Sequence, residues 1–121
     1  MFKDFPLPNH PDAQKAAEAA QCAGEQGKYW EMHDLIFINQ SNMGVPALKQ
    51  QAAAMKLDSA KFDQCVDSGR HAAGIAEDMK TGEQMGVAST PTLYINGRPV
   101  LGAQPFEYFK RVIDEELARV K

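Results

Sequence analysis

Gly86-Val87-Ala88-Ser89-Thr90-Pro91-Thr92-Leu93-Tyr94-Ile95-Asn96-Gly97 is the stretch of this 121-residue chain that most restricts its fold. Residues 92–95 favour β-strand, and Asn-Gly follows them directly. Asn-Gly is the strongest short signal for a β-hairpin, because both residues of a two-residue turn need a positive φ. We therefore expect strands near residues 92–95 and 98–101. Pro99 cannot donate to a ladder, so the second strand should be a sheet edge.

The segments on both sides of this hairpin have a helical pattern. Upstream, apolar periodicity and breaks at glycine or proline predict five helices, at about residues 11–24, 29–40, 45–55, 58–69 and 70–85. The second of them contains the chain's only tryptophan, Trp30, which we expect to anchor a core. Downstream, a helix should begin near Pro105. Its apolar residues have the spacing of a helix that packs on a sheet, at Phe106, Phe109, Ile113 and Leu117.

The first residues of the chain predict a short strand. Residues 2–7 alternate in part between apolar and polar side chains, and Pro6 and Pro8 should stop the strand. Together with the five helices, the hairpin and the last helix, this gives a mixed α/β pattern without an internal repeat or a linker.

Composition excludes several classes of protein. Apolar residues make up 44% and charged residues 24%, which is ordinary for a globular domain. The net charge of −3, without a Lys/Arg cluster, argues against nucleic acid as a partner. No apolar run is long enough to span a membrane, and the N-terminal residues lack the apolar core of a signal peptide. The two cysteines and three histidines do not have the spacing of metal ligands, so we expect no metal site and no cofactor.

The segment that contains Thr90-Pro91 resembles the cis-proline loop and following hairpin of the thioredoxin superfamily. In that fold a Thr-Pro dipeptide enters the strand through a cis peptide bond. Residues 2–7, 24–34 and 102–106 are similar to the DsbA-like branch, which inserts a helical subdomain between the two halves of the core. The resemblance implies one partial DsbA-like thioredoxin domain over residues 1–121. The helical insert would lie at about 11–85, and the core hairpin and helix at about 86–121.

The sequence departs from that family at the redox centre. Members carry Cys-x-x-Cys at the start of a helix, where the helix N-terminus stabilises the thiolate. No such motif occurs in these 121 residues. The strand and helix that carry it would precede Phe2, so we expect either a truncated domain or a naturally short protein. The family implies protein disulfide oxidation or isomerisation in the periplasm or another extracytoplasmic compartment, and this chain should be inactive in that chemistry alone.

The resemblance also implies a binding role for Thr90 and Pro91. In the family, the backbone beside the cis-proline pairs with an extended substrate peptide, which is strand addition. An extended peptide or an unfolded protein is therefore the expected partner. An alternative function is a non-catalytic peptide-binding module that uses this loop. We also expect a homo-oligomer, because an incomplete core leaves apolar surface and strand edges open.

Cys22 and Cys65 have three interpretations. They could be two buried free thiols, since unpaired cysteine is among the most buried residue types. They could form a structural disulfide between the first and fourth helices, as in some exported relatives of the family. They could also be a redox-active pair, which would make the chain an enzyme by other means. Their apolar helix faces do not favour the exposed thiolate of low pKa that such chemistry needs.

Overall fold

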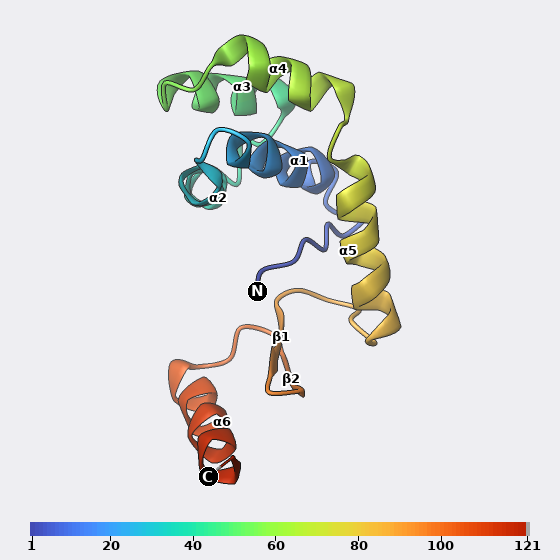
Figure 1. Cartoon of the computed structure of the whole chain (residues 1–121), viewed down its shortest axis with the longest axis vertical. Helices are drawn as coiled ribbons and strands as arrows, with labels where there is room; N and C mark the ends of the chain where they lie inside the picture. Colours follow the sequence, from blue (N-terminus) through green and yellow to red (C-terminus); the bar gives the residue numbers. More distant parts are fainter. Residues whose placement is uncertain (121) are drawn as a thin grey trace. The chain divides into compact units, whose positions relative to one another are not determined.

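The computed structural model describes residues 1–120 and divides the chain into two compact units, Met1–Thr81 and Gly82–Lys121. Figure 1 shows the elements, which within the described residues are six helices and one two-stranded antiparallel sheet. They are α1 (Ala13–Gly24), α2 (Tyr29–Ile38), α3 (Val45–Ala54), α4 (Ser59–Ser68), α5 (Ala72–Gln84), β1 (Thr92–Ile95), β2 (Arg98–Leu101) and α6 (Phe106–Arg119). The predicted mixed α/β class is thus confirmed. None of the described helices has both the length and the apolar character needed to cross a membrane.

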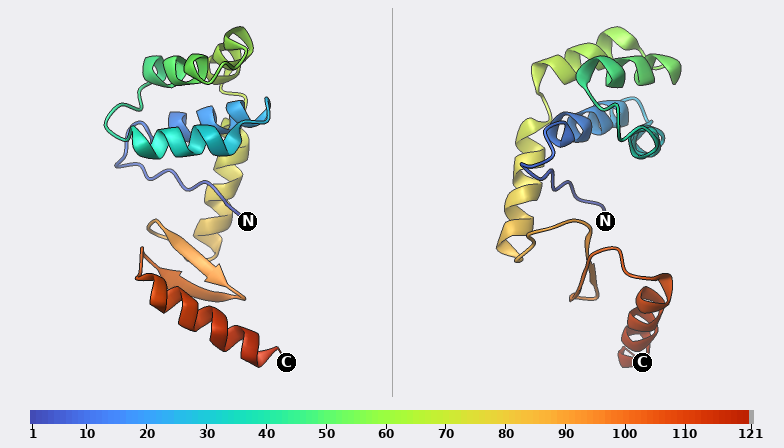
Figure 2. Two further views of the ribbon diagram at one scale, coloured as in Figure 1. Left: turned by 90° about the vertical axis from the view of Figure 1, so that its left-hand side faces the viewer. Right: turned by 180° about the vertical axis from the view of Figure 1, so that it is seen from behind.

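The first unit is built around α1, which contacts α2, α3 and α4 (Figure 2). Apart from Glu18, its buried residues are small, so the neighbouring helices can approach closely; Ala19 and Ala23 have no exposed surface. Larger side chains from the other helices fill the space around this face. The cluster contains Ala19, Cys22, Ala23, Met32, Leu48, Ala52, Phe62, Cys65 and Val66. Because α2, α3 and α4 all contribute to it, the helical unit has a core of its own.

Helix α4 begins and ends as its sequence predicts. The side chain of Asp58 accepts a hydrogen bond from the backbone N–H of Lys61 at 3.1 Å, which satisfies a donor that the helix itself cannot. Gly69 follows the last turn with φ = 65°, a left-handed conformation that glycine adopts without a steric penalty. The chain then turns sharply into α5.

The strand predicted at residues 2–7 is not present, and this prediction was wrong. The segment is irregular, and side chains replace a ladder as its partners. The N–H of Asp4 donates to Asp78 Oδ2 at 3.2 Å, and its carboxylate accepts from Gln21 Nε2 at 3.0 Å. A strand requires a neighbouring backbone, which this segment does not meet among the described residues. Burial is the main cause that raises the pKa of Asp4 above 3.8, and the nearby Asp78 adds to it.

Aromatic side chains gather outside the core of the first unit. Trp30 is 56% exposed, so the expectation that it anchors a core was wrong; Met32 occupies the core position of α2 instead. The ring centroid of Phe2 lies 5.8 Å from that of Trp30 and 5.2 Å from that of His33. Burial, followed by the charges of two nearby aspartates, raises the pKa of Tyr29 in this cluster to about 12.

The second unit contains the predicted hairpin. Asn96 and Gly97 both have positive φ, 52° and 85°, as the two-residue turn requires. The register pairs Thr92 with Leu101, and Ile95 with Arg98. Helix α6 packs on one face of this hairpin, where it contacts β1 (Figure 2), and Val100 of β2 is 2% exposed.

The face of α6 that is buried differs from the predicted one. Val112 and Glu116 are buried, whereas Phe106, Ile113 and Leu117 are 75%, 44% and 55% exposed. Glu116 can be buried because its carboxylate accepts hydrogen bonds, from Asn96 at 3.1 Å, Arg98 at 3.3 Å and Arg119 at 3.0 Å. The Asn96 amide, followed by the charges of Arg119 and Arg98, holds its pKa below the ordinary value of 4.5. A hydrogen-bonded carboxylate thus replaces part of the expected apolar stripe.

Candidate functional site

The loop before β1 carries the binding residues that the sequence predicts. Thr90 and Pro91 are both exposed, and the peptide bond between them is cis. Two hydrogen bonds fix the loop to its surroundings: Thr92 Oγ1 donates to the carbonyl of Ser89 at 2.7 Å, and the N–H of Gly102 donates to the carbonyl of Pro91 at 2.8 Å. The loop therefore enters β1 in a defined position.

The Pro91–Gly102 hydrogen bond shows which backbone groups of the hairpin point toward the partner strand and which point outward. Opposed residues of an antiparallel pair alternate between those that share both hydrogen bonds and those that share none. Since Gly102 is bonded to Pro91, the bonded pairs further along are Leu93–Val100 and Ile95–Arg98, as the register gives them. Thr92–Leu101 and Tyr94–Pro99 are then the non-bonded pairs, so their backbone groups point away from the partner strand.

The outer edge of β1 is consequently open. The outward N–H and C=O groups of Thr92 and Tyr94 have no hydrogen-bond partner within residues 1–120, and neither do those of Thr90. The outer edge of β2 is less able to pair with another strand, because Pro99 has no N–H to donate. Of the two edges, β1 is the one equipped to accept another strand, and it continues directly from the Thr90–Pro91 loop.

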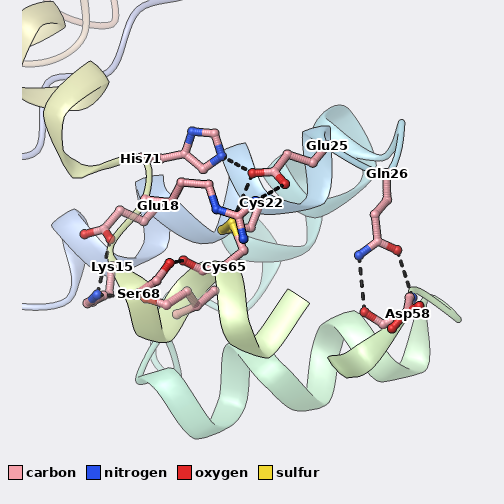
Figure 3. The surroundings of a disulfide bond; sticks show 11 residues. Lys15, Glu18, Cys22, Glu25, Gln26, Asp58, Cys65, Ser68 and His71 are labelled. Carbon is pink, nitrogen blue, oxygen red and sulfur yellow. Dashed lines mark hydrogen bonds and ion pairs between the residues drawn. A yellow bond between two sulfur atoms is a disulfide. The ribbon is translucent and has the colours of Figure 1, made fainter. Parts of the chain in front are cut away.

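The first unit contains the other predicted pair. Cys22 of α1 and Cys65 of α4 form a disulfide, with Cα atoms 5.8 Å apart and a separation of 43 positions in sequence (Figure 3). The sequence left three interpretations of these cysteines open, and in the structure they form the disulfide. The two residues are only 1% and 2% exposed, so a second thiolate cannot reach their sulfur atoms without movement of the helices.

A charged cluster lies beside this disulfide (Figure 3). Glu25, at the end of α1, accepts hydrogen bonds from His71 Nε2 at 2.5 Å and from the Arg70 guanidinium at 3.0 Å. Its Oε2 also lies 3.2 Å from Cys65 Sγ. Because a disulfide sulfur carries no proton, this last approach is a contact and not a hydrogen bond. The histidine and carboxylate are partly exposed, at 28% and 35% of their side chains, and so link the buried sulfurs with solvent.

Sequence reasoning found the cysteines but not the groups around them. Glu25 follows Cys22 at the i,i+3 spacing of one helix face, but no spacing rule connects Arg70 and His71, which belong to a turn, with either of them. The signal that could have found them is Gly69, because a left-handed residue after α4 turns the next two side chains back toward α1. His33 packs among aromatic rings and contacts Asp34 at 3.1 Å. The two predicted sites, at the loop and at the disulfide, belong to different units.

The comparisons with known proteins agree with the fold. The family model described as thioredoxin matches residues 1–115. The chain belongs to the thioredoxin family. No solved structure matches this thioredoxin-family chain at a significant level.

Curated relatives of this thioredoxin-family chain carry the names of membrane transporters. It is 36% identical over 119 residues to the Na(+)/H(+) antiporter NhaA 1 of Salinispora arenicola, which is 98% of the chain and 18% of that protein. It is 39% identical over 99 residues to NhaA 3 of Salinispora tropica, and 31% identical over 97 residues to NhaA of Herminiimonas arsenicoxydans. The match covers 81% and 80% of the chain, and 15% and 16% of those two proteins. The chain thus spans less than a fifth of these relatives.

Proposed function

We propose that this chain is a DsbA-like module, related to protein disulfide oxidoreductases, that binds an extended polypeptide through the Thr90–Pro91 loop and the outer edge of β1. In this proposal the chain does not exchange disulfides by itself. The observation that carries the proposal is the row of outward backbone groups at Thr92 and Tyr94, which have no partner within the described residues.

Strand addition suits this edge for two reasons. Main-chain hydrogen bonds supply affinity with little dependence on the sequence of the partner, as binding to unfolded proteins requires. The loop is held by Thr92 and Gly102, so the edge does not have to be ordered before it binds. Both features favour a weak and general receptor for extended chains.

The cysteines support the second half of the proposal. Exchange needs an accessible thiolate of lowered pKa, whereas Cys22 and Cys65 are buried and joined to each other. A disulfide of this kind fits an oxidising compartment, and we extend the proposal to an extracytoplasmic location.

A pair of proline variants tests the binding edge. Thr92→Pro removes an outward N–H from β1, and Leu101→Pro makes the same change at the directly opposed residue of β2. Binding of a short fluorescent extended peptide, followed by anisotropy, should weaken about tenfold or more in Thr92→Pro, because one backbone hydrogen bond and its register are lost. Leu101→Pro should bind like the parent chain. Equal effects of the two variants would contradict the proposed edge.

Two controls separate the backbone from the side chain. Thr92→Val removes the hydroxyl bond to Ser89 but keeps the N–H, so it should retain most of the affinity. A peptide with N-methyl groups on alternate amides should bind poorly to every variant. If Thr92→Val is as weak as Thr92→Pro, the loop bond and not the edge controls binding.

Turnover is tested with dithiol-dependent reduction of insulin, with a complete DsbA-like protein as the positive control. The chain alone should give no activity above the dithiol background. Activity that Cys22→Ser abolishes would overturn the proposal and assign the redox chemistry to the buried pair.

The same edge also supports our proposal of a homo-oligomer. An open strand can pair with its own copy, and the exposed α6 residues Phe106, Ile113 and Leu117 offer apolar surface to bury. Self-association through β1 should compete with peptide binding, so added peptide should reduce self-association.

A further inference from the structure

Three side chains beside the α1–α4 connection have their ligand atoms close together. Cys22, Cys65 and His71 each place one such atom within 4.8 Å of the other two. The sulfurs are buried, and the imidazole is partly exposed at the end of the cluster nearer to solvent. Figure 3 shows that they come from α1, α4 and the turn before α5. Two thiols and one imidazole are the donor set of many zinc sites.

Glu25 holds His71 from outside this donor set. Its Oε2 lies 2.5 Å from His71 Nε2 and 3.2 Å from Cys65 Sγ. Its other oxygen, Oε1, accepts from Arg70, which fixes the orientation of the carboxylate. Metal sites characteristically hold their ligands through such outer hydrogen bonds.

The backbone allows the required separation of the sulfurs. Two thiolates on one tetrahedral zinc, with Zn–S bonds of about 2.3 Å, lie about 3.8 Å apart. Cys22 and Cys65 have Cα atoms 5.8 Å apart, which leaves room for two side chains to meet one ion without separating α1 from α4. His71 follows the turn at Gly69, so a small rotation of that turn can bring its imidazole to the metal.

The charges also balance. Two thiolates and the Glu25 carboxylate give three negative charges, and Arg70 gives one positive charge. With a neutral imidazole, a divalent cation brings the total to zero. A cluster that would carry uncompensated thiolates after reduction therefore has a physical reason to take up such an ion.

We propose that reduction of the Cys22–Cys65 disulfide converts this cluster into a Zn²⁺ site, with the two thiolates and a ring nitrogen of His71 as ligands and with Glu25 as the outer partner of the histidine. The reductant is a dithiol, which reaches the buried sulfurs when α1 and α4 move apart, gives two electrons and two protons to the disulfide and becomes a disulfide itself. Zinc then displaces one proton from each thiol and binds between the two sulfurs and His71. The covalent link between α1 and α4 is replaced by a coordinate one. This inference does not depend on the binding edge of β1.

Zinc uptake by the oxidised and the reduced chain tests the proposal. A water-soluble phosphine is used as the reductant, since it becomes a phosphine oxide and does not chelate zinc as a dithiol would. Competition with a chromogenic chelator should give one Zn²⁺ per reduced chain, bound at least a hundredfold more tightly than by the oxidised chain. Co²⁺ in place of zinc should give thiolate charge-transfer absorption with two thiolate ligands.

Histidine variants decide whether the site is the folded cluster. His71→Ala should weaken zinc binding by tenfold or more, and Glu25→Gln by about tenfold, which is typical of groups that hold or orient a ligand. His33→Ala is the matched control, because His33 is 21% exposed against 28% for His71, and it should bind zinc normally. Zinc should also raise the denaturation midpoint of the reduced chain, and should not do so in His71→Ala. Equal uptake by oxidised and reduced chains, or normal uptake by His71→Ala, would overturn the proposal.

Discussion

Reduction of the Cys22–Cys65 disulfide should destabilise the helical unit by a predictable amount. The bond joins residues separated by 43 positions, and in the chain-entropy account a closed loop of this length stabilises the folded state by about 4 kcal/mol. The loop encloses α2, α3 and most of α4, which supply much of the core. The loss should therefore affect the whole first unit and not only one helix end.

The chain provides its own probe for this measurement. Trp30 is the only tryptophan and lies within the closed loop, so its fluorescence reports on the helical unit. With a slope of about 2 kcal/mol per molar guanidinium chloride, a loss of 4 kcal/mol lowers the unfolding midpoint by about 2 M. The experiment compares the oxidised chain with the phosphine-reduced chain, both in the presence of a metal chelator.

The double variant Cys22→Ala/Cys65→Ala is the control for the chemistry of the reductant. Its unfolding midpoint should lie near that of the reduced chain, and phosphine should not change this midpoint further. A midpoint shift on reduction that corresponds to less than about 1 kcal/mol would contradict a large contribution from the disulfide. It would mean that α1 and α4 are held together by packing around Phe62 and Val66, with little contribution from the covalent link.

Three further predictions concern carboxylates and assembly. Asp4→Asn should raise the thermal midpoint at pH 7, because folding raises the pKa of Asp4 and therefore disfavours its ionised form. Below about pH 3.8 the carboxyl is protonated in both the folded and the unfolded chain, so the difference in thermal midpoint between Asp4→Asn and the parent should vanish there. Glu116 has a lowered pKa, so its contribution to folding stability is present above pH 4.5 and is lost as acid protonates the carboxylate. Acid titration followed by circular dichroism should show this loss of stability in the parent chain, and Glu116→Gln should not show it. Light scattering at micromolar concentration should give a mass above one chain, and Thr92→Pro should lower it; a single-chain mass for the parent would contradict assembly through β1.

Local chemistry made much of the fold predictable. Asn96-Gly97 predicted the hairpin turn because few other dipeptides accept two positive φ angles, and the structure has both. The helix expected at about residues 58–69 likewise matches α4, whose ends at Asp58 and Gly69 depend only on neighbouring backbone groups. Such signals act within a few residues, so the sequence alone contains them.

Features that depend on distant partners could not be predicted in the same way. Residues 2–7 have a strand-like pattern, but a strand forms only beside another backbone. In this chain the segment is bonded instead to the side chains of Asp78 and Gln21. The buried face of α6 was misassigned because Glu116 is an unlikely core residue until Asn96, Arg98 and Arg119 are placed around it. Glu25 and His71 meet at the disulfide only because the turn at Gly69 directs the chain back toward α1.

Titration of the ¹⁵N-labelled chain with an extended, cysteine-free peptide is the most direct test of the proposed binding role. We expect the backbone amide shifts to concentrate at Thr90, Thr92 and Tyr94, while the β2 edge at Leu101 and the helices around Cys22–Cys65 change little. Shifts that leave the β1 edge unchanged, or that gather instead around the disulfide, would contradict it.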